Sequence, residues 1–198
     1  MKFMQIDAKG KACPQPVILA KKALDGGSSD LTVLVDNQAA VENLTRLGNS
    51  MNVNVQSGAA EGGFYVHFTG EAKPGEAPVA PRASNGNGYA VFIGKDTVGN
   101  GERELGYNLL KMAIYTFAQS DDVPASMLFM NSGVKLPAGD EAQVIENLQI
   151  LIDKGTNVLV CGTCLNYYKI ADQLKIGIAS NMYDIISAMQ RADKVITL

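Results

Sequence analysis

Short apolar runs and helix-like patterns take turns along residues 1–70. Phe3–Asp7 and Leu31–Val35 each have the length and apolar content of a strand. Helical spacing follows each run, and the apolar positions are Val17, Ile18, Leu19, Ala20 and Leu24, and then Val41, Leu44 and Leu47. Two alternating strands complete the segment, through Val53 and Val55 and through Phe64, Val66 and Phe68. The pattern predicts the order βαβαββ.

Residues 89–198 repeat a strand-then-helix pattern to the end of the chain. The predicted strands are 89–93, 127–130, 158–160, 176–179 and 195–196, and the predicted helices are 102–117, 144–152, 165–173 and 182–189. Nearly continuous apolar strands that alternate with helices predict an α/β domain, with a parallel sheet covered by helices on both faces. Ligands of such sheets bind at the carboxyl ends of the strands, and Cys161 follows one of those ends.

The two patterned regions are separated by a stretch that has neither pattern. Pro74, Pro78 and Pro81 lie close together there, and residues 84–88 contain no apolar side chain. Such a composition is typical of a linker. We therefore predict a first domain over residues 1–71, a flexible linker over 72–88 and a second domain over 89–198.

Composition narrows the class of protein. The chain has 198 residues, 46% of them hydrophobic, and a net charge of -3, which argues against a nucleic-acid partner. No apolar run approaches the length of a membrane span. The three cysteines are too few for a disulfide framework. A cytoplasmic location is the expectation.

Each cysteine stands where a helix is predicted to begin. Cys13 lies in Cys13-Pro14-Gln15-Pro16, at the predicted N-cap position, and Cys161 and Cys164 lie in Cys161-Gly162-Thr163-Cys164. Unpaired N–H groups at a helix start lower the pKa of a nearby thiol, so these cysteines are candidates for thiolate chemistry. The alternative for Cys13 is a small buried hydrophobe, which its two proline neighbours disfavour.

The pair Cys161 and Cys164 has the spacing of a redox dithiol, and Gly162 permits a tight turn between them. Half of a zinc site and two inert thiols are the alternatives. Zinc needs two further ligands, and the only other cysteine and histidine, Cys13 and His67, lie in the other predicted domain. We predict no metal site.

The first domain resembles the SirA/TusA-like sulfur carriers. The resemblance rests on Asp7, Gly10, Cys13, Pro14 and Pro16, followed by Lys21-Lys22-Ala23-Leu24. It implies a two-layer sandwich of two helices on a four-stranded sheet. It also implies that Cys13 accepts sulfur as a persulfide and passes it on.

Residues 89–198 resemble the DsrE-like sulfur-relay proteins, through the strand that ends at Cys161 and through segments 176–182 and 192–196. The resemblance implies that Cys161 bears sulfur, with Cys164 as an extra thiol that resolves the persulfide. The fused pair of domains is similar to YedF-type proteins associated with selenium metabolism, so selenium is a possible variant cargo.

Four other features are candidates for a role. His67 alternates with buried positions and is expected to be solvated. The Gly99-Asn100-Gly101 segment is expected to be a plain tight turn rather than an anion site. The Tyr167-Tyr168 pair and the broad apolar surface of the 102–117 helix fit a homo-oligomer, although a deeply buried helix would explain the second feature equally.

Together these observations predict a sulfur carrier that exchanges persulfide sulfur with donor and acceptor proteins, without metal or organic cofactor. Whether it counts as an enzyme of the sulfurtransferase kind stays open. A thiol-disulfide oxidoreductase using Cys161 and Cys164 is the main alternative. A non-enzymatic module whose cysteines sense oxidants is another.

Overall fold

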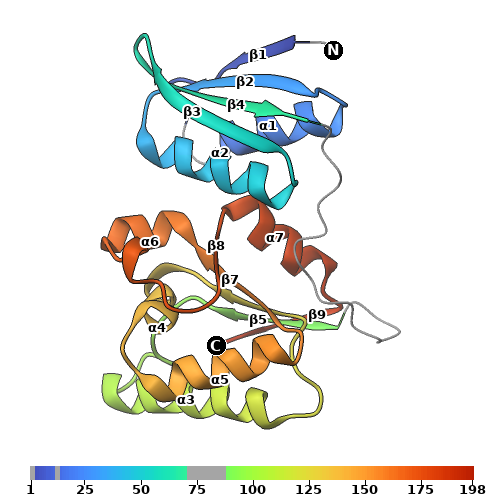
Figure 1. Ribbon diagram of the computed structural model, residues 1–198. Coiled ribbons are helices and arrows are strands. Elements are labelled where there is room, and N and C mark those ends of the chain that lie inside the picture. The colour runs from blue at the N-terminus through green and yellow to red at the C-terminus, as the bar shows by residue number, and fades with distance from the viewer. Residues whose placement is uncertain (1–2, 12–13, 71–87) are drawn as a thin grey trace. The chain divides into compact units, whose positions relative to one another are not determined.

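The computed structural model describes residues 3–11, 14–70 and 88–198, which form two separate sheets with their own helices (Figure 1). The predicted linker, apart from Gly88, lies outside the described residues. The elements of the first region are β1 (Phe3–Asp7), α1 (Gln15–Asp25), β2 (Asp30–Val35), α2 (Gln38–Ser50), β3 (Asn54–Ala60) and β4 (Gly63–Thr69). The predicted βαβαββ order is therefore confirmed.

The first sheet has the strand order β1-β2-β4-β3, with β1 parallel to β2 and the other neighbours antiparallel. Both helices cover one face of this sheet (Figure 1). The apolar periodicity of the sequence explains this arrangement, because alternate residues of each strand and one stripe of each helix are buried together. The largest fully buried side chains of this core are Leu31, Leu44, Leu47 and Phe68.

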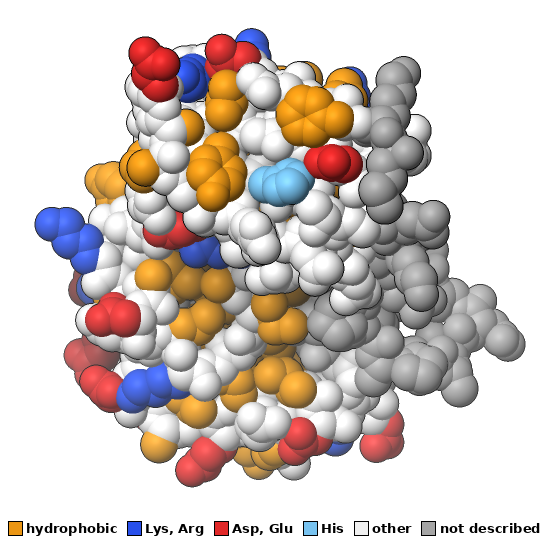
Figure 2. Space-filling model, turned by 45° about the horizontal axis from the view of Figure 1, so that its top comes forward, with side chains coloured by type: hydrophobic (Ala, Val, Ile, Leu, Met, Phe, Trp, Pro, Cys, Tyr) orange, Lys and Arg blue, Asp and Glu red, His pale blue; other side chains and the backbone are white. Residues whose placement is uncertain are grey.

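The opposite face of the first sheet carries polar side chains, among them His67. Its Nε2 lies 2.8 Å from Oδ1 of Asp30, and both side chains are about one-third exposed. Figure 2 shows the imidazole at the surface beside an acidic side chain. His67 thus faces solvent, as expected, but it is paired with a carboxylate rather than only hydrated.

The second region begins with β5 (Tyr89–Ile93), α3 (Arg103–Gln119) and β6 (Ser126–Phe129). A 3-10 turn (Asn131–Val134) and the short α4 (Lys135–Ala138) follow. The remaining elements are α5 (Ala142–Asp153), β7 (Asn157–Cys161), α6 (Gly162–Tyr168), a 3-10 turn (Ala171–Gln173), β8 (Ile178–Ser180), α7 (Met182–Arg191) and β9 (Lys194–Thr197).

All five strands of this sheet are parallel, in the order β8-β7-β6-β5-β9. Helices α3 and α5 cover one face and α7 covers the other (Figure 1). The interior strand β7 is buried along its whole length, as expected for a strand between two layers of helices. The predicted parallel α/β domain is confirmed. Among the described residues, no helix is both long and apolar enough to cross a membrane.

Two parts of the second region differ from the sequence-based prediction. Residues 131–138 form helical turns where no element was predicted, since the segment is too short for a periodic pattern. The helix expected from residue 165 begins at Gly162, directly after β7. On α3, Leu105, Leu109 and Met112 are exposed, so burial of the whole helix does not explain its apolar breadth.

Candidate functional site

The thiol pair lies where β7 ends and α6 begins. Cys161 is the last residue of the buried strand and the N-cap residue of α6, where its sulfur accepts a hydrogen bond from the N–H of Cys164 at 3.4 Å. Gly162 is the buried first residue of α6, and its φ is not positive. The turn between the cysteines is therefore ordinary helix rather than a special glycine turn, which differs from the expectation for Gly162.

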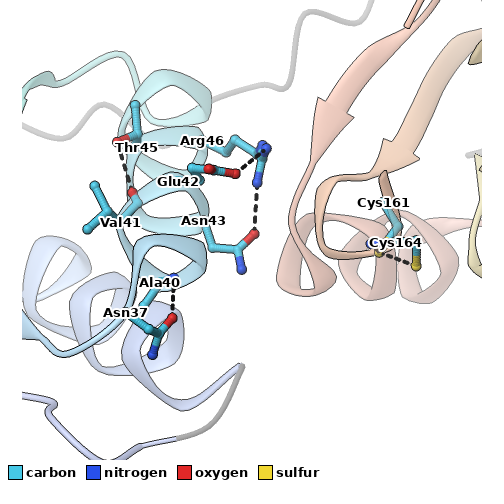
Figure 3. A network of polar contacts seen from close by, with 9 residues as sticks. All are labelled: Asn37, Ala40, Val41, Glu42, Asn43, Thr45, Arg46, Cys161 and Cys164. Atoms are coloured by element: carbon cyan, nitrogen blue, oxygen red, sulfur yellow. Dashed lines mark hydrogen bonds and ion pairs between the residues drawn. The ribbon is translucent and has the colours of Figure 1, made fainter. Parts of the chain in front are cut away.

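The two sulfurs lie 2.8 Å apart, and both cysteines are free thiols (Figure 3). Their surroundings differ. Cys161 is 2% exposed, whereas Cys164 is half-buried. Because only Cys164 has access to solvent, it is the sulfur that an external reagent meets first.

Ionisation also favours Cys164. The contact with the Cys161 thiol lowers the pKa of Cys164 to about 6, because an S–H donor stabilises the thiolate; burial opposes the shift and the Asn131 N–H supports it. The same contact with Cys164, together with burial, raises the pKa of Cys161. The sequence led us to expect a low pKa at Cys161, whereas its contact with Cys164 and its burial shift the pKa in the opposite direction.

The loop after β6 supplies the second donor to Cys164. The backbone N–H of Asn131 lies 3.2 Å from the Cys164 sulfur. Asn131 has a left-handed backbone conformation, with φ of 47°, which asparagine tolerates better than most residues. Its side-chain Oδ1 accepts a hydrogen bond from the hydroxyl of Tyr168 at 2.9 Å. Tyr168 belongs to α6, so Asn131 joins two adjacent strand ends.

Asp96, in the loop after β5, forms hydrogen bonds with Ser132, the residue that follows Asn131. The hydroxyl of Ser132 donates to Oδ1 of Asp96 at 3.0 Å and accepts from the Asp96 N–H at 3.2 Å. Asp96 is 6% exposed and also accepts from Nη2 of Arg103 at 2.5 Å. Burial raises the pKa of Asp96, but the hydrogen bonds from Arg103 and Ser132 outweigh it, so the net pKa is lowered. A buried carboxylate thereby fixes the loop that faces Cys164.

Sequence reasoning did not identify Asn131, Ser132 or Asp96. Their positions could have indicated a site, because each residue follows a predicted strand of a parallel sheet. The carboxyl ends of neighbouring parallel strands meet at one edge of the sheet. Strand order was needed to use that signal, because it places β5, β6 and β7 side by side.

In the first region, Cys13 lies outside the described residues, but the loop before it is described. Asp7 accepts the Lys9 N–H at 3.0 Å, and Gly10, with φ of 73°, donates its N–H to Oδ2 of Asp36 at 2.6 Å. The hydrogen bond from Gly10 lowers the pKa of Asp36. Asp36 was also missed by sequence reasoning; it follows β2, which is parallel to β1, so the two strand ends meet.

The proline positions shift by one residue from the prediction. Pro14 is the N-cap of α1 rather than its first residue, and the buried Pro16 is the second residue of the helix. A proline in the first turn costs no hydrogen bond, since those N–H groups have no partner within the helix. The described chain therefore resumes at Pro14 with a rigid helix start.

The remaining candidates have ordinary surroundings. Gly99 has a φ of 76°, and Asn100 Oδ1 accepts from the Lys95 ammonium at 2.5 Å, which fits the tight turn expected there. Across the part of the chain that the structure describes, no group of three or more His, Cys, Asp or Glu side chains is close enough to hold a metal ion.

Family models match both regions of the chain. The model described as Sulfurtransferase TusA matches residues 4–69, and that of the DsrE/DsrF-like family matches residues 89–198. No curated protein matches the chain.

Solved structures are similar to one region each. A SirA-like protein from Desulfitobacterium hafniense is 37% identical, with 33% of this chain and 95% of that chain covered and a TM-score of 0.32. The YchN protein from E. coli is 21% identical, with 56% of this chain and 99% of that chain covered and a TM-score of 0.41. The chain belongs to the DsrE/DsrF-like family through residues 89–198 and to the TusA, SirA-like family through residues 4–69, and both are families of sulfur relay.

Proposed function

We propose that the chain carries persulfide sulfur on Cys13 in the first region and on the Cys161 and Cys164 pair in the second. Within the pair, Cys164 is the first nucleophile and Cys161 its buried partner, which reverses the order that the family resemblance implies. One observation carries this assignment: the half-buried Cys164 sulfur accepts the Asn131 N–H at 3.2 Å and lies 2.8 Å from the sulfur of the buried Cys161.

Loading is a transfer of one sulfur atom without net oxidation. The Cys164 thiolate attacks the terminal sulfur of a donor persulfide, so a new S–S bond forms on Cys164 and the S–S bond of the donor breaks. The donor leaves as a thiolate. A thiolate with a pKa of about 6 is ionised at neutral pH and is therefore ready for this step.

Two outcomes are open to the loaded pair. An acceptor thiolate can take the outer sulfur by the same exchange, which returns Cys164 to a thiolate. Alternatively the Cys161 sulfur attacks Cys164, and the outer sulfur leaves with the Cys161 proton as hydrogen sulfide. That second route forms a Cys161–Cys164 disulfide, which needs an external thiol reductant before the next cycle.

The test is intact mass spectrometry of single-cysteine variants after incubation with glutathione persulfide. We expect one added sulfur atom on variants that retain only Cys13 or only Cys164, and none on the variant that retains only Cys161. A loaded Cys161-only variant beside an unloaded Cys164-only variant contradicts the assignment. A protein that gains sulfur on no cysteine contradicts the function. Glutathione selenopersulfide (GS–SeH) can transfer one selenium atom by the same exchange, with glutathione thiolate as the leaving group, and so tests selenium as cargo by the larger added mass.

A thiol-disulfide oxidoreductase is the second candidate, and the 2.8 Å separation of the two sulfurs favours it. Formation of a disulfide needs only a small approach of the two side chains. A reversible potential near that of the cytosolic glutathione pool, in a protein that gains no sulfur, supports this candidate. Sulfur that binds and is never passed on supports the oxidant-sensing module instead.

We further propose that the second region forms a homo-oligomer through α3. Leu105, Leu109 and Met112 recur at i, i+4 and i+7 and are between 41% and 63% exposed, so they form one apolar stripe. A second copy is the occupant that buries such a stripe against its own equivalent. Sedimentation of the Leu109→Glu variant is expected to show a smaller species than the wild type; an unchanged species contradicts the proposal.

A further inference from the structure

Asn131, in the loop after β6, contacts both Cys164 and Tyr168. Its N–H lies 3.2 Å from the Cys164 sulfur, and its Oδ1 accepts from the Tyr168 hydroxyl at 2.9 Å. Cys164 and Tyr168 are four positions apart on α6 and so lie on the same face of that helix. One residue of a neighbouring loop therefore bridges two successive turns of α6.

The backbone of Asn131 needs such support. A φ of 47° is uncommon for a residue with a side chain, and asparagine adopts it more readily than most. On one side, Ser132 is fixed by its two hydrogen bonds with the buried Asp96. On the other side, the hydroxyl of Tyr168 holds the side chain of Asn131. The direction of the Asn131 N–H depends on both restraints.

The ring of Tyr168 is itself fixed. The Nζ of Lys135 lies 4.5 Å from the centre of the ring, within the range of a cation–π contact. The ring of Tyr167 meets it edge-on, with centroids 5.2 Å apart. Tyr167 is 81% exposed, so the two adjacent tyrosines differ in their environment although they share a chemistry. This pair provides a matched comparison.

We infer that Tyr168 is a positioning residue for the sulfur chemistry of Cys164: its hydroxyl holds Asn131 so that the Asn131 N–H points at the Cys164 sulfur. The inference deepens the proposed function and rests on Cys164 as the nucleophile. Tyr168 acts through Asn131 and does not contact the sulfur in the hydrogen bonds described. Its effect is on how readily the thiolate forms, because a charge-assisted N–H···S contact stabilises the anion more than the neutral thiol.

The test measures the alkylation rate of Cys164 by iodoacetamide against pH, peptide by peptide, in the full chain. For Tyr168→Phe we expect the midpoint of the profile to rise by about one pH unit. That is the size of the effect expected when the Asn131 N–H no longer donates to the Cys164 thiolate. The matched Tyr167→Phe variant is expected to keep the wild-type midpoint. A midpoint unchanged in Tyr168→Phe, or moved equally in Tyr167→Phe, overturns the inference.

A second variant separates positioning from general loosening of the helix. Asn131→Gly keeps the left-handed conformation available but removes the acceptor of the Tyr168 hydroxyl. We expect it to raise the midpoint as Tyr168→Phe does, and the double variant to shift no further, because both changes remove one contact. Additive shifts, or no shift in Asn131→Gly, overturn the inference even if Tyr168→Phe does not fold.

The alkylation profile needs no persulfide, so it is independent of sulfur loading. A wild-type protein that shows the expected profile but gains no sulfur contradicts the proposed function and leaves the positioning role supported. A protein that loads sulfur normally while Tyr168→Phe shows no shift contradicts only the positioning role.

Discussion

The two proposed sulfur sites, at Cys13 and at Cys161 and Cys164, differ in the neighbours that surround them. Before Cys13, the loop is held by oxygen acceptors: Asp36 accepts the Gly10 N–H at 2.6 Å, and the Glu61 carbonyl accepts from the Lys9 ammonium at 2.6 Å. At the end of β7, a sulfur is held by another sulfur, 2.8 Å away. In the first region the contacts hold a loop in place, whereas in the second region the contact between the sulfurs lowers the pKa of the Cys164 thiol.

This difference has a chemical consequence. Residues 1–70 contain a single cysteine, so a persulfide on Cys13 can be passed to another thiol but cannot form a disulfide within its own region. The second region has two thiols in contact and can pass its sulfur or release it. Under the proposed function, the chain therefore joins a site that only exchanges sulfur to one that can also reduce it, with the buried thiol supplying the electrons.

The largest expected effect is at Cys164 itself. Cys164→Ser removes the half-buried thiol and leaves only the buried thiol of Cys161 in this region. We expect alkylation of the 161–164 peptide at pH 7 to fall by about 100-fold or more, since the thiolate is the reacting form. Peptide mass spectrometry after timed iodoacetamide treatment measures the rate. Faster alkylation in Cys164→Ser than in Cys161→Ser would remove the distinction between the two thiols.

The next effect isolates the influence of one sulfur on the other. In the wild type the pKa of Cys164 is about 6, so alkylation falls as pH drops through 6 because the thiolate gains a proton. Cys161→Ala removes the S–H donor, and we expect the midpoint to rise by about one to two pH units.

Cys161→Ser is the control for that variant, because its hydroxyl can still donate to Cys164 and should keep part of the shift. Equal midpoints in Cys161→Ala and the wild type would show that the sulfur pair does not tune Cys164. The second site would then resemble the first more closely.

A smaller effect is expected in the first region, where support acts through the loop. Asp36→Ala removes the acceptor of the Gly10 N–H, and the loop before Cys13 loses a restraint. We expect the alkylation rate of Cys13 to change by a few-fold and that of Cys164 to stay the same. Asp25→Ala is the control, because Asp25 is an exposed carboxylate of the same region paired only along α1, with Lys21. An equal change in both variants would argue against a specific role for Asp36.

The sequence predicted the elements better than it predicted the site. Hydrophobic periodicity is a local property, and it was enough for the order of strands and helices in both regions. The support of Cys164 is not local: Asn131 and Cys164 are 33 positions apart, and Asp96 and Ser132 are 36 apart. These contacts depend on which strands are neighbours, and no local pattern encodes the order β8-β7-β6-β5-β9.

The assignment of roles within the pair shows the same limit. The spacing of Cys161 and Cys164 indicated a dithiol, but which sulfur faces solvent depends on where the helix begins. Because α6 starts at Gly162, Cys161 stays in the buried end of β7 and Cys164 occupies the first turn. A helix starting at residue 165, as predicted, would have left that choice open.

The smallest effect tests whether the two regions are energetically separate. Asn37 caps α2 by accepting the Ala40 N–H at 2.9 Å (Figure 3). Asn37→Ala should cost the helix about 1 kcal/mol, whereas Asn37→Ser keeps a side-chain acceptor and should cost less. Hydrogen exchange of peptides from residues 38–50 measures this cost, since a chain with two compact units need not unfold in one step. Faster exchange should be confined to the first region, because the residues that contact the thiol pair, Asn131 among them, belong to the second region. If Asn37→Ala also moved the alkylation midpoint of Cys164, the residues that support Cys164 would have to include some in the first region. The two sites could then no longer be compared as independent of each other.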